Sequence, residues 1–196
     1  SATVAAVVEA ARIALDRGQR EIILTGVDLA SYGDDSDTAL ATLVEALLAL
    51  PDLARLRLSS LDPHRIDDAL FALLTQESRV MPHVHLSLQA GDDMVLARMK
   101  RRHRRADAVA LVARLKAARP QIAIGADLIA GFPTEDESMF ANSLALIDDC
   151  DIVFGHIFPY SPRAGTAAAR MPQVDRAIAR ARAATLRAAN MQRRHA

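Results

Sequence analysis

The sequence predicts an α/β fold in which a parallel sheet forms part of a (β/α) barrel. Short apolar runs begin near residues 21, 55, 83, 122 and 152 and alternate with segments of helical periodicity. Intervals of about 30 to 40 residues leave room for one helix between consecutive strands, as right-handed βαβ crossovers require. Each run also ends in small polar residues, and parallel α/β folds bind ligands at the carboxyl ends of their strands. These clusters favour a barrel-like sheet with a ligand at its mouth.

The first half of the chain begins with a helix. Residues 3–17 carry apolar side chains at helical spacing, and the segment stops at Gly18, a residue common after helix C-termini. A helix in first place predicts that at least one strand precedes it in the complete sheet. The apolar run 21–27 is short, as buried strands are. The following elements are predicted at 38–50 (helix, ended by Pro51), 55–59 (strand), 66–76 (helix) and 83–88 (strand).

The second half continues the alternation. Residues 92–118 have helical periodicity, with a break expected near Arg105. Thr134 and Glu137 have the spacing of a capping box, which predicts that a helix opens at Thr134. The remaining elements are predicted at 122–129 (strand), 152–158 (strand) and 175–194 (helix).

Composition excludes several classes of protein. Hydrophobic residues make up 51% of the 196 and charged residues 24%, which is the balance of a globular domain and not of a disordered chain. No run approaches the roughly 20 apolar residues of a membrane helix, and the first residues do not resemble a signal peptide. A single cysteine, Cys150, excludes a disulfide within the chain and indicates a reducing compartment, so we expect a cytoplasmic protein.

Charge is divided unevenly although the net charge is zero. Residues 1–97 carry 7 Lys/Arg against 15 Asp/Glu, and residues 98–196 carry 17 against 9. This asymmetry favours a polyanionic partner on one side, with solvated helix faces as the simpler interpretation. Aromatic residues are only 4% of the chain, which disfavours RNA binding based on base stacking.

Five motifs, in order along residues 21–172, resemble those of the radical S-adenosylmethionine (SAM) methylthiotransferases. They lie at residues 25–33, 57–63, 82–103, 125–135 (GADLIAGFPTE) and 158–168 (FPYSPRAGTAA). Residues 57–62 and 99–103 are most similar to the branch that acts on threonylcarbamoyladenosine beside the tRNA anticodon. Sister branches act on isopentenyladenosine or on a ribosomal-protein aspartate, and these substrates are the alternatives.

The resemblance implies a partial radical SAM barrel whose first strand and cluster loop are missing. In the family, a CxxxCxxC loop holds a 4Fe-4S cluster that reduces SAM, and a methylthio group is added to carbon 2 of the modified adenine. The implied cofactors are SAM and, in the full-length protein, 4Fe-4S clusters; the implied partners are a tRNA anticodon stem-loop and an electron donor, with no membrane. Cys150 alone cannot hold such a cluster, so we expect the loop upstream of Ser1 and an inactive chain in isolation.

The resemblance also implies two parts. Residues 1–172 form the partial barrel core, and residues 173–196 form a basic helix that leads toward a missing RNA-binding domain. An open parallel edge invites association, so we expect the isolated core to be poorly soluble.

The resemblance places SAM at the carboxyl ends of the strands. Gly26 and Asp28 occupy the place where the family binds the amino group of the SAM methionine, and a tight turn between strand and helix is the alternative. Ser87 and Gln89 are two residues apart on a strand, so we expect both side chains on one side, where they bond the ribose or carboxylate of SAM. Polar groups satisfied by neighbouring loops are the alternative.

Five further residues complete the implied SAM site. Asp127 is expected to face inward like Ile129, and its carboxylate needs either ribose hydroxyls or a salt bridge to a neighbouring arginine. Arg101 matches an arginine of the family and is expected to bind the SAM carboxylate as a bidentate pair. Ile129, Phe158 and Tyr160 offer apolar or flat surfaces to adenine, although Ile129 and Phe158 also suit core packing.

A basic run and a histidine pair stand beside these residues. Six of the eight residues 98–105 are lysine or arginine. Lys100, Arg102, Arg104 and Arg105 are candidates for tRNA phosphate contacts, which supply affinity but not base selection, and a solvated face is the alternative.

His83 and His85 share one face of a strand. No third ligand follows at a metal-binding spacing, so we favour packed or hydrogen-bonded histidines over a metal pair. Cys150 follows an amphipathic helix, and we expect it to be a buried, small apolar group.

Two other function classes remain open. A barrel enzyme that binds phosphate without radical chemistry needs a glycine loop at a late strand, and residues 131–133 form a weak one. A non-catalytic RNA-binding remnant, without a cluster loop, is the second alternative.

Overall fold

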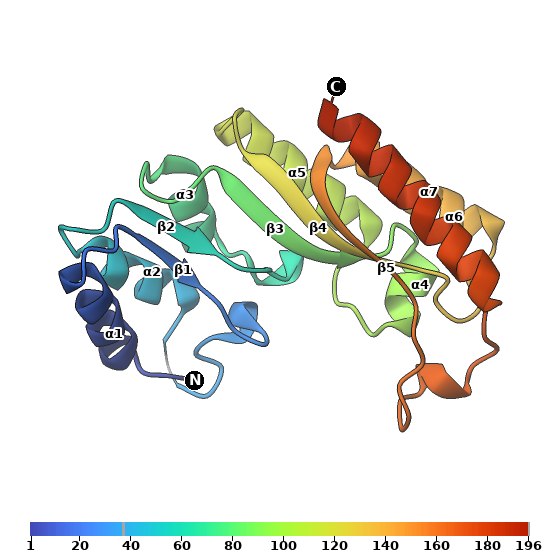
Figure 1. Ribbon diagram of the computed structural model, residues 1–196, viewed down its shortest axis with the longest axis horizontal. Helices are drawn as coiled ribbons and strands as arrows, with labels where there is room; N and C mark the ends of the chain where they lie inside the picture. The colour runs from blue at the N-terminus through green and yellow to red at the C-terminus, as the bar shows by residue number, and fades with distance from the viewer. Residues whose placement is uncertain (37, 196) are drawn as a thin grey trace.

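The computed structural model describes residues 1–36 and 38–195 and contains five parallel strands with helices packed along their outer side (Figure 1). The strands are β1 (Glu21–Leu24), β2 (Arg55–Leu58), β3 (His83–Gln89), β4 (Ala123–Ala130) and β5 (Ile152–Pro159). The helices are α1 (Val4–Asp16), α2 (Leu40–Leu48), α3 (Asp68–Gln76), α4 (Asp93–Arg98), α5 (Arg105–Ala118), α6 (Glu137–Asp149) and α7 (Arg176–His195). The predicted α/β alternation is confirmed.

The strands follow chain order in two neighbouring parallel sheets, β1-β2 and β3-β4-β5. β1 pairs with β2, and β4 pairs with β3 on one side and β5 on the other, in each case in parallel. Single parallel bridges, Leu56 to Val80 and Leu61 to Leu86, join the two halves. Apart from the short α4, successive helices contact one another around the outside, as in a (β/α) barrel. Among the described residues β1 and β5 do not pair, so the barrel is partial.

Alternation along the strands separates an apolar outer face from a polar inner face. Six outer-face residues of the two central strands are each at most 1% exposed: Val84, Leu86, Leu88, Ile124, Ala126 and Leu128. Burial of a large aliphatic side chain stabilises the fold by about 1.5–3 kcal/mol. The inner face carries His83, His85, Asp127 and His156, together with the exposed ring of Phe158. The titratable side chains therefore lie together on the inner face of the strands, which the helices do not cover.

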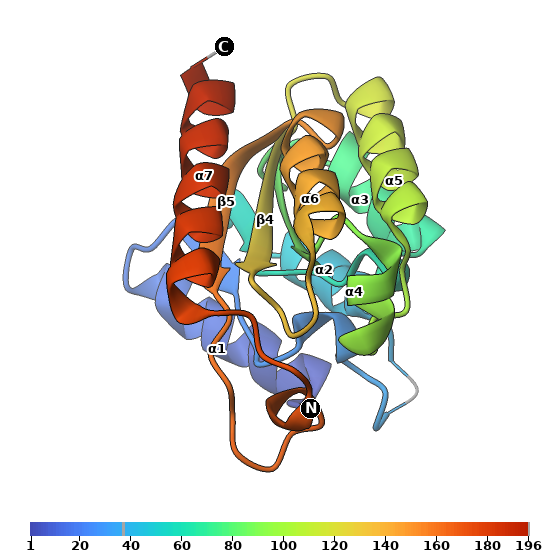
Figure 2. The ribbon, with the colours of Figure 1, turned by 90° about the vertical axis from the view of Figure 1, so that its right-hand side faces the viewer.

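Helix α7 covers the outer edge of β5, and Figure 2 shows it lying along that strand beside α6. The Asn190 amide donates to the Ile152 carbonyl (2.7 Å) and accepts from the Gly155 N–H (3.0 Å), and Arg187 donates to the Ile157 carbonyl. These bonds satisfy backbone groups of an edge strand that otherwise invite association. The C-terminal helix thus packs on the barrel core. That it leads toward an RNA-binding domain stays a prediction.

The predicted capping box is wrong. Helix α6 begins at Glu137 with Asp136 as its N-cap, whose carboxylate accepts from the Met139 N–H (2.9 Å). Thr134 lies before the helix with φ of 67°, and its hydroxyl donates to the Pro133 carbonyl. A carboxylate one residue before the helix competes successfully for the N-cap because it also favours the positive end of the helix dipole. The break expected near Arg105 is confirmed between α4 and α5.

Candidate functional site

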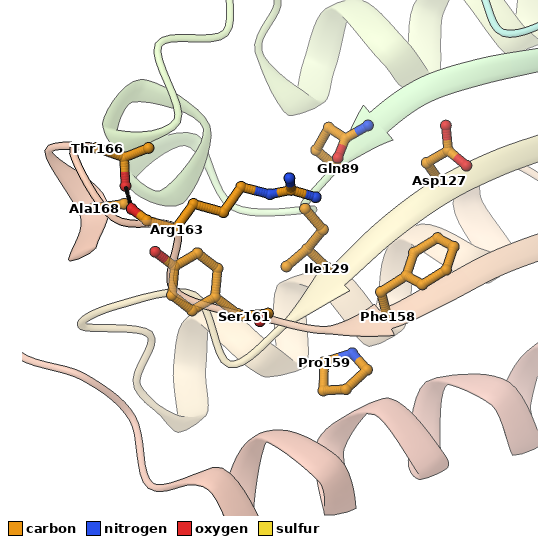
Figure 3. A pocket seen from close by; sticks show the side chains of 10 residues that line it. Gln89, Asp127, Ile129, Phe158, Pro159, Ser161, Arg163, Thr166 and Ala168 are labelled. Carbon is orange, nitrogen blue, oxygen red and sulfur yellow. Dashed lines mark hydrogen bonds between the residues drawn. The ribbon is translucent and has the colours of Figure 1, made fainter.

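Two neighbouring pockets open at the carboxyl ends of the strands, and Asp127 lines both. The first, a cavity of about 610 Å³, is shown in Figure 3. Its lining includes Gln89, Asp127, Ile129, Phe158, Tyr160 and Arg163. The second pocket is lined by residues that include Gly26, Asp28, Asp62, Ser87, Arg101 and Asp127. All nine residues predicted to contact SAM therefore line one pocket or the other.

The first pocket combines flat apolar surfaces with polar groups at its edge. The ring of Phe158 is 54% exposed, and Tyr160 is held edge-on against the buried Phe132 (ring centroids 5.2 Å apart). Figure 3 shows the Arg163 side chain extending across the pocket toward Gln89 and Ile129. Sequence reasoning missed Arg163, although it lies in the motif that follows β5.

The second pocket places a cation opposite carboxylates. Arg101 Nη1 lies 3.8 Å from the Asp62 carboxylate, which holds the guanidinium at the pocket. Asp62 is itself fixed, because its side chain accepts from the His64 N–H (2.9 Å). Asp28 lies in the loop after β1 and Arg101 in the loop after α4. The negative and the positive charge therefore come to the pocket from different parts of the chain.

Ser87 and Gln89, which we expect on one side of the strand, line different pockets. The pairing of β3 with β4 shifts register between Leu86 and Gln89, and Gln89 has φ of 69°. Gln89 lines the first pocket and Ser87 lines the second, while the intervening Leu88 is completely buried. A left-handed conformation in a non-glycine residue costs free energy and is often found at functional sites.

Asp127 is held by histidines, so the salt bridge to an arginine that was the alternative is wrong. His85 Nε2 lies 3.0 Å from Asp127 Oδ1, and His156 Nδ1 lies 3.4 Å from the same oxygen. Burial acts to raise the pKa of Asp127, but hydrogen bonds to the two histidines and their charge outweigh it, so the pKa lies below its ordinary value. Ser60 approaches the other oxygen, Oδ2, at 3.4 Å.

Glycine at position 125 makes room for these rings. A Cβ there is placed only 2.5 Å from His85 Nδ1 and 3.2 Å from His83 Nε2. The histidine rings therefore lie over the backbone of β4, where another residue would push them away. His85 is hydrogen-bonded, which is one of the two arrangements expected for the histidine pair. Its partner could not be found from the sequence, because Asp127 is 42 residues away along the chain.

The basic run is divided by the fold. Lys100, Arg102 and Arg104 are exposed and make no ion pair with any residue in 1–36 or 38–195. Arg105, also predicted to contact phosphate, is paired with Asp149 of α6, so its charge is already neutralised. The remaining three flank Arg101 and therefore border the second pocket.

The residues fit SAM but not an iron–sulfur cluster. Apolar surfaces, an arginine and carboxylates around two joined pockets match the adenine, carboxylate and ammonium groups of SAM. An iron–sulfur cluster is held by cysteine thiolates. Cys150 is completely buried at the C-terminus of α6, and burial raises the pKa of its thiol to about 12. It lines neither pocket.

A family model described as "Radical SAM superfamily" matches residues 1–147, and the chain belongs to this superfamily. It is 49% identical over 174 residues to the threonylcarbamoyladenosine tRNA methylthiotransferase MtaB of Rickettsia prowazekii, which covers 87% of this chain and 41% of that protein. It is 37% identical over 155 residues to MtaB of Thermotoga maritima, and the match covers 79% of this chain and 36% of that protein. The chain thus spans about two fifths of the length of these curated relatives.

Solved structures share the fold at low sequence identity. The radical SAM methyltransferase TsrM from Kitasatospora setae superimposes with a TM-score of 0.64 at 18% identity, over 80% of this chain and 31% of that one. Coproporphyrinogen III oxidase (HemN) from Escherichia coli superimposes with a TM-score of 0.57 at 16% identity, over 83% of this chain and 40% of that one.

Within residues 1–36 and 38–195 no helix is both long and apolar enough to cross a bilayer.

We expect the chain to lose stability as pH falls below about 6.5. Burial, with the positive charge of His85, Arg57 and His156, lowers the pKa of His83 below 6.5, and burial also lowers that of His103. Both groups therefore take up protons at a lower pH in the folded chain than in the unfolded chain, so the stabilisation present above pH 6.5 declines below it. Urea unfolding at pH 7.5 and 5.5 measures the loss.

The matched control is His103→Gln, which removes one of the two titrating groups. Its unfolding free energy should change less between the two pH values than that of the parent chain. An equal or steeper pH dependence in the variant contradicts the assignment of His103.

Proposed function

We propose that this chain is the SAM-binding core of a tRNA methylthiotransferase that adds a methylthio group to carbon 2 of threonylcarbamoyladenosine next to the anticodon. The observation that carries the proposal is the convergence of nine predicted residues, from the ends of four strands and the loop after α4, on two pockets that meet at Asp127. The names of the two curated relatives support the nucleoside over isopentenyladenosine or a ribosomal-protein aspartate.

In the first pocket the adenine of SAM packs between apolar groups. Ile129, Phe158 and Tyr160 supply aliphatic and aromatic surface, and the Gln89 amide supplies both a donor and an acceptor for the base edge. The ionised Asp127 carboxylate accepts hydrogen bonds from ribose hydroxyls through Oδ2, while the histidines hold Oδ1. Asp127 thereby fixes the middle of the ligand.

In the second pocket the methionine part of SAM meets opposite charges. The Arg101 guanidinium binds the carboxylate and Asp28 binds the ammonium group. The contact from Asp62 restrains Arg101 before the ligand arrives, which reduces the entropy lost on binding. These residues orient SAM and exclude water from it.

Bound SAM, once reduced by an iron–sulfur cluster, would supply the radical chemistry, and the protein would supply binding and orientation. Because Cys150 lies outside both pockets, we assign no cluster ligand within this sequence. The 4Fe-4S clusters and their electron donor are therefore proposed for a longer protein that carries this core.

The tRNA is proposed to approach the same end of the barrel. Lys100, Arg102 and Arg104 are exposed on the loop after α4, directly beside Arg101 of the second pocket. Contacts to phosphates from this loop position an RNA over the pockets without selecting its bases.

The phosphate-binding alternative is less well supported. A phosphate loop needs free backbone N–H groups, but the Gly131 N–H already donates to the buried Glu135 carboxylate (2.8 Å). Arg182 in turn donates to that carboxylate (3.0 Å), so the loop is closed by the chain's own side chains.

We expect the 196-residue chain to bind SAM with 1:1 stoichiometry, and Arg101→Ala to weaken binding about 10-fold or more. A hydrogen bond to a charged group contributes about 1.5–3 kcal/mol, which corresponds to that loss. Isothermal titration calorimetry measures both affinities. The matched control is Arg102→Ala, one residue away, exposed and outside both pockets. Absence of SAM binding, or equal losses in the two variants, contradicts the proposal.

We expect the triple variant Lys100→Ala/Arg102→Ala/Arg104→Ala to bind an anticodon stem-loop RNA more weakly and with a smaller salt dependence. Removing three phosphate contacts should reduce the slope of log affinity against log salt by about 2 to 3. Filter binding at several salt concentrations tests this. Arg12→Ala/Arg17→Ala/Arg20→Ala, in α1 and the segment before the amino end of β1, removes the same formal charge and is the control. An equal effect of both triple variants indicates nonspecific attraction and rejects the assigned surface.

A further inference from the structure

Three side chains on the inner face converge on one point. His85 from β3, Asp127 from β4 and His156 from β5 each offer one ligand atom, and these atoms all lie within 4.8 Å of one another. The two imidazole nitrogens flank the same carboxylate oxygen at 3.0 and 3.4 Å.

The spacing matches that of ligands around a metal ion. Bonds of about 2.0–2.2 Å to nitrogen or oxygen, at tetrahedral or octahedral angles, place neighbouring ligand atoms about 2.8 to 3.6 Å apart. Both histidine–aspartate distances already fall in that range. Only the two imidazoles must approach each other, and the His156 side chain is 64% exposed.

The pairing of the strands sets the positions of the three proposed ligands before any ion binds. Asp127 and His156 are direct neighbours in the register of β4 and β5, and His85 pairs with Gly125, whose missing side chain leaves space for the imidazole. The His85 side chain is only 8% exposed. Ligands fixed on adjacent strands lose little conformational entropy on binding.

The donor set selects a chemical class of ion. Two imidazoles and one carboxylate suit divalent transition metals such as zinc, iron and cobalt, whereas calcium and magnesium prefer sites made of oxygen ligands. Three protein ligands also leave coordination positions open. Since Asp127 lines both pockets, the open positions adjoin the proposed ligand site.

We propose that His85, Asp127 and His156 form a binding site for one divalent transition-metal ion at the inner face of the barrel. The site is separate from any iron–sulfur cluster, because none of its ligands is a thiolate. It does not depend on SAM binding. The rival account is a hydrogen-bonded cluster in which protons, and no metal, join the three side chains.

The test uses Co²⁺ as the probe, added to the untagged, chelator-treated chain in the absence of SAM. We expect saturable binding of one ion with visible d–d absorption bands, and competition by Zn²⁺. His156→Ala changes an exposed side chain, so the fold is retained, and it should weaken Co²⁺ binding at least about 10-fold. Asp127→Asn, which keeps the size of the side chain, should do the same.

His83→Ala is the matched control, since His83 lies on the same strand and face as His85 but packs edge-on against Phe154 (ring centroids 5.8 Å apart) and is not one of the three ligands. It should bind Co²⁺ as the parent chain does. Absence of one-to-one binding in the parent, or equal binding by His156→Ala and the parent, overturns the proposal in favour of the hydrogen-bonded cluster. Either result leaves the SAM titration unaffected, so the two proposals fail separately.

Discussion

The parallel pairing of β4 with β3 on one side and β5 on the other is the constraint on which the rest of the structure depends. It turns Gly125, Asp127 and Ile129 to the inner face and Ile124, Ala126 and Leu128 to the helices. A shift of one residue would exchange these two sets, burying a carboxylate under helices and exposing the core. The fold and the site therefore have one origin, the register of the central strand.

The same register makes the inner face polar, and the polar groups stabilise one another. Asp127 loses hydration on the half-buried sheet, and the adjoining imidazoles of His85 and His156 offset that cost. At the strand ends Asp62 holds Arg101 in a similar way. Asp127 and Arg101 are thus each restrained by a partner from another element, which suits a site that must orient a flexible cofactor.

Sequence predicted the strands and the helix order from periodicity, and the nine residues that the family resemblance assigned to SAM all line the two pockets. Sequence reasoning did not find Arg163, which also lines the first pocket. It failed where distant segments or local competition decide. The partners of Asp127 come from other strands, and the ion pair of Arg105 comes from α6. Asp136 displaced Thr134 as the cap of α6. None of these outcomes is encoded in spacing alone.

The central claim is that two pockets joined at Asp127 form one SAM site. Its most direct test is a crystal structure of the chain soaked with SAM. The account predicts adenine against Ile129 and Phe158, ribose at Asp127 and the methionine carboxylate at Arg101. SAM bound elsewhere on the chain, or with its adenine and methionine ends exchanged between the pockets, contradicts it.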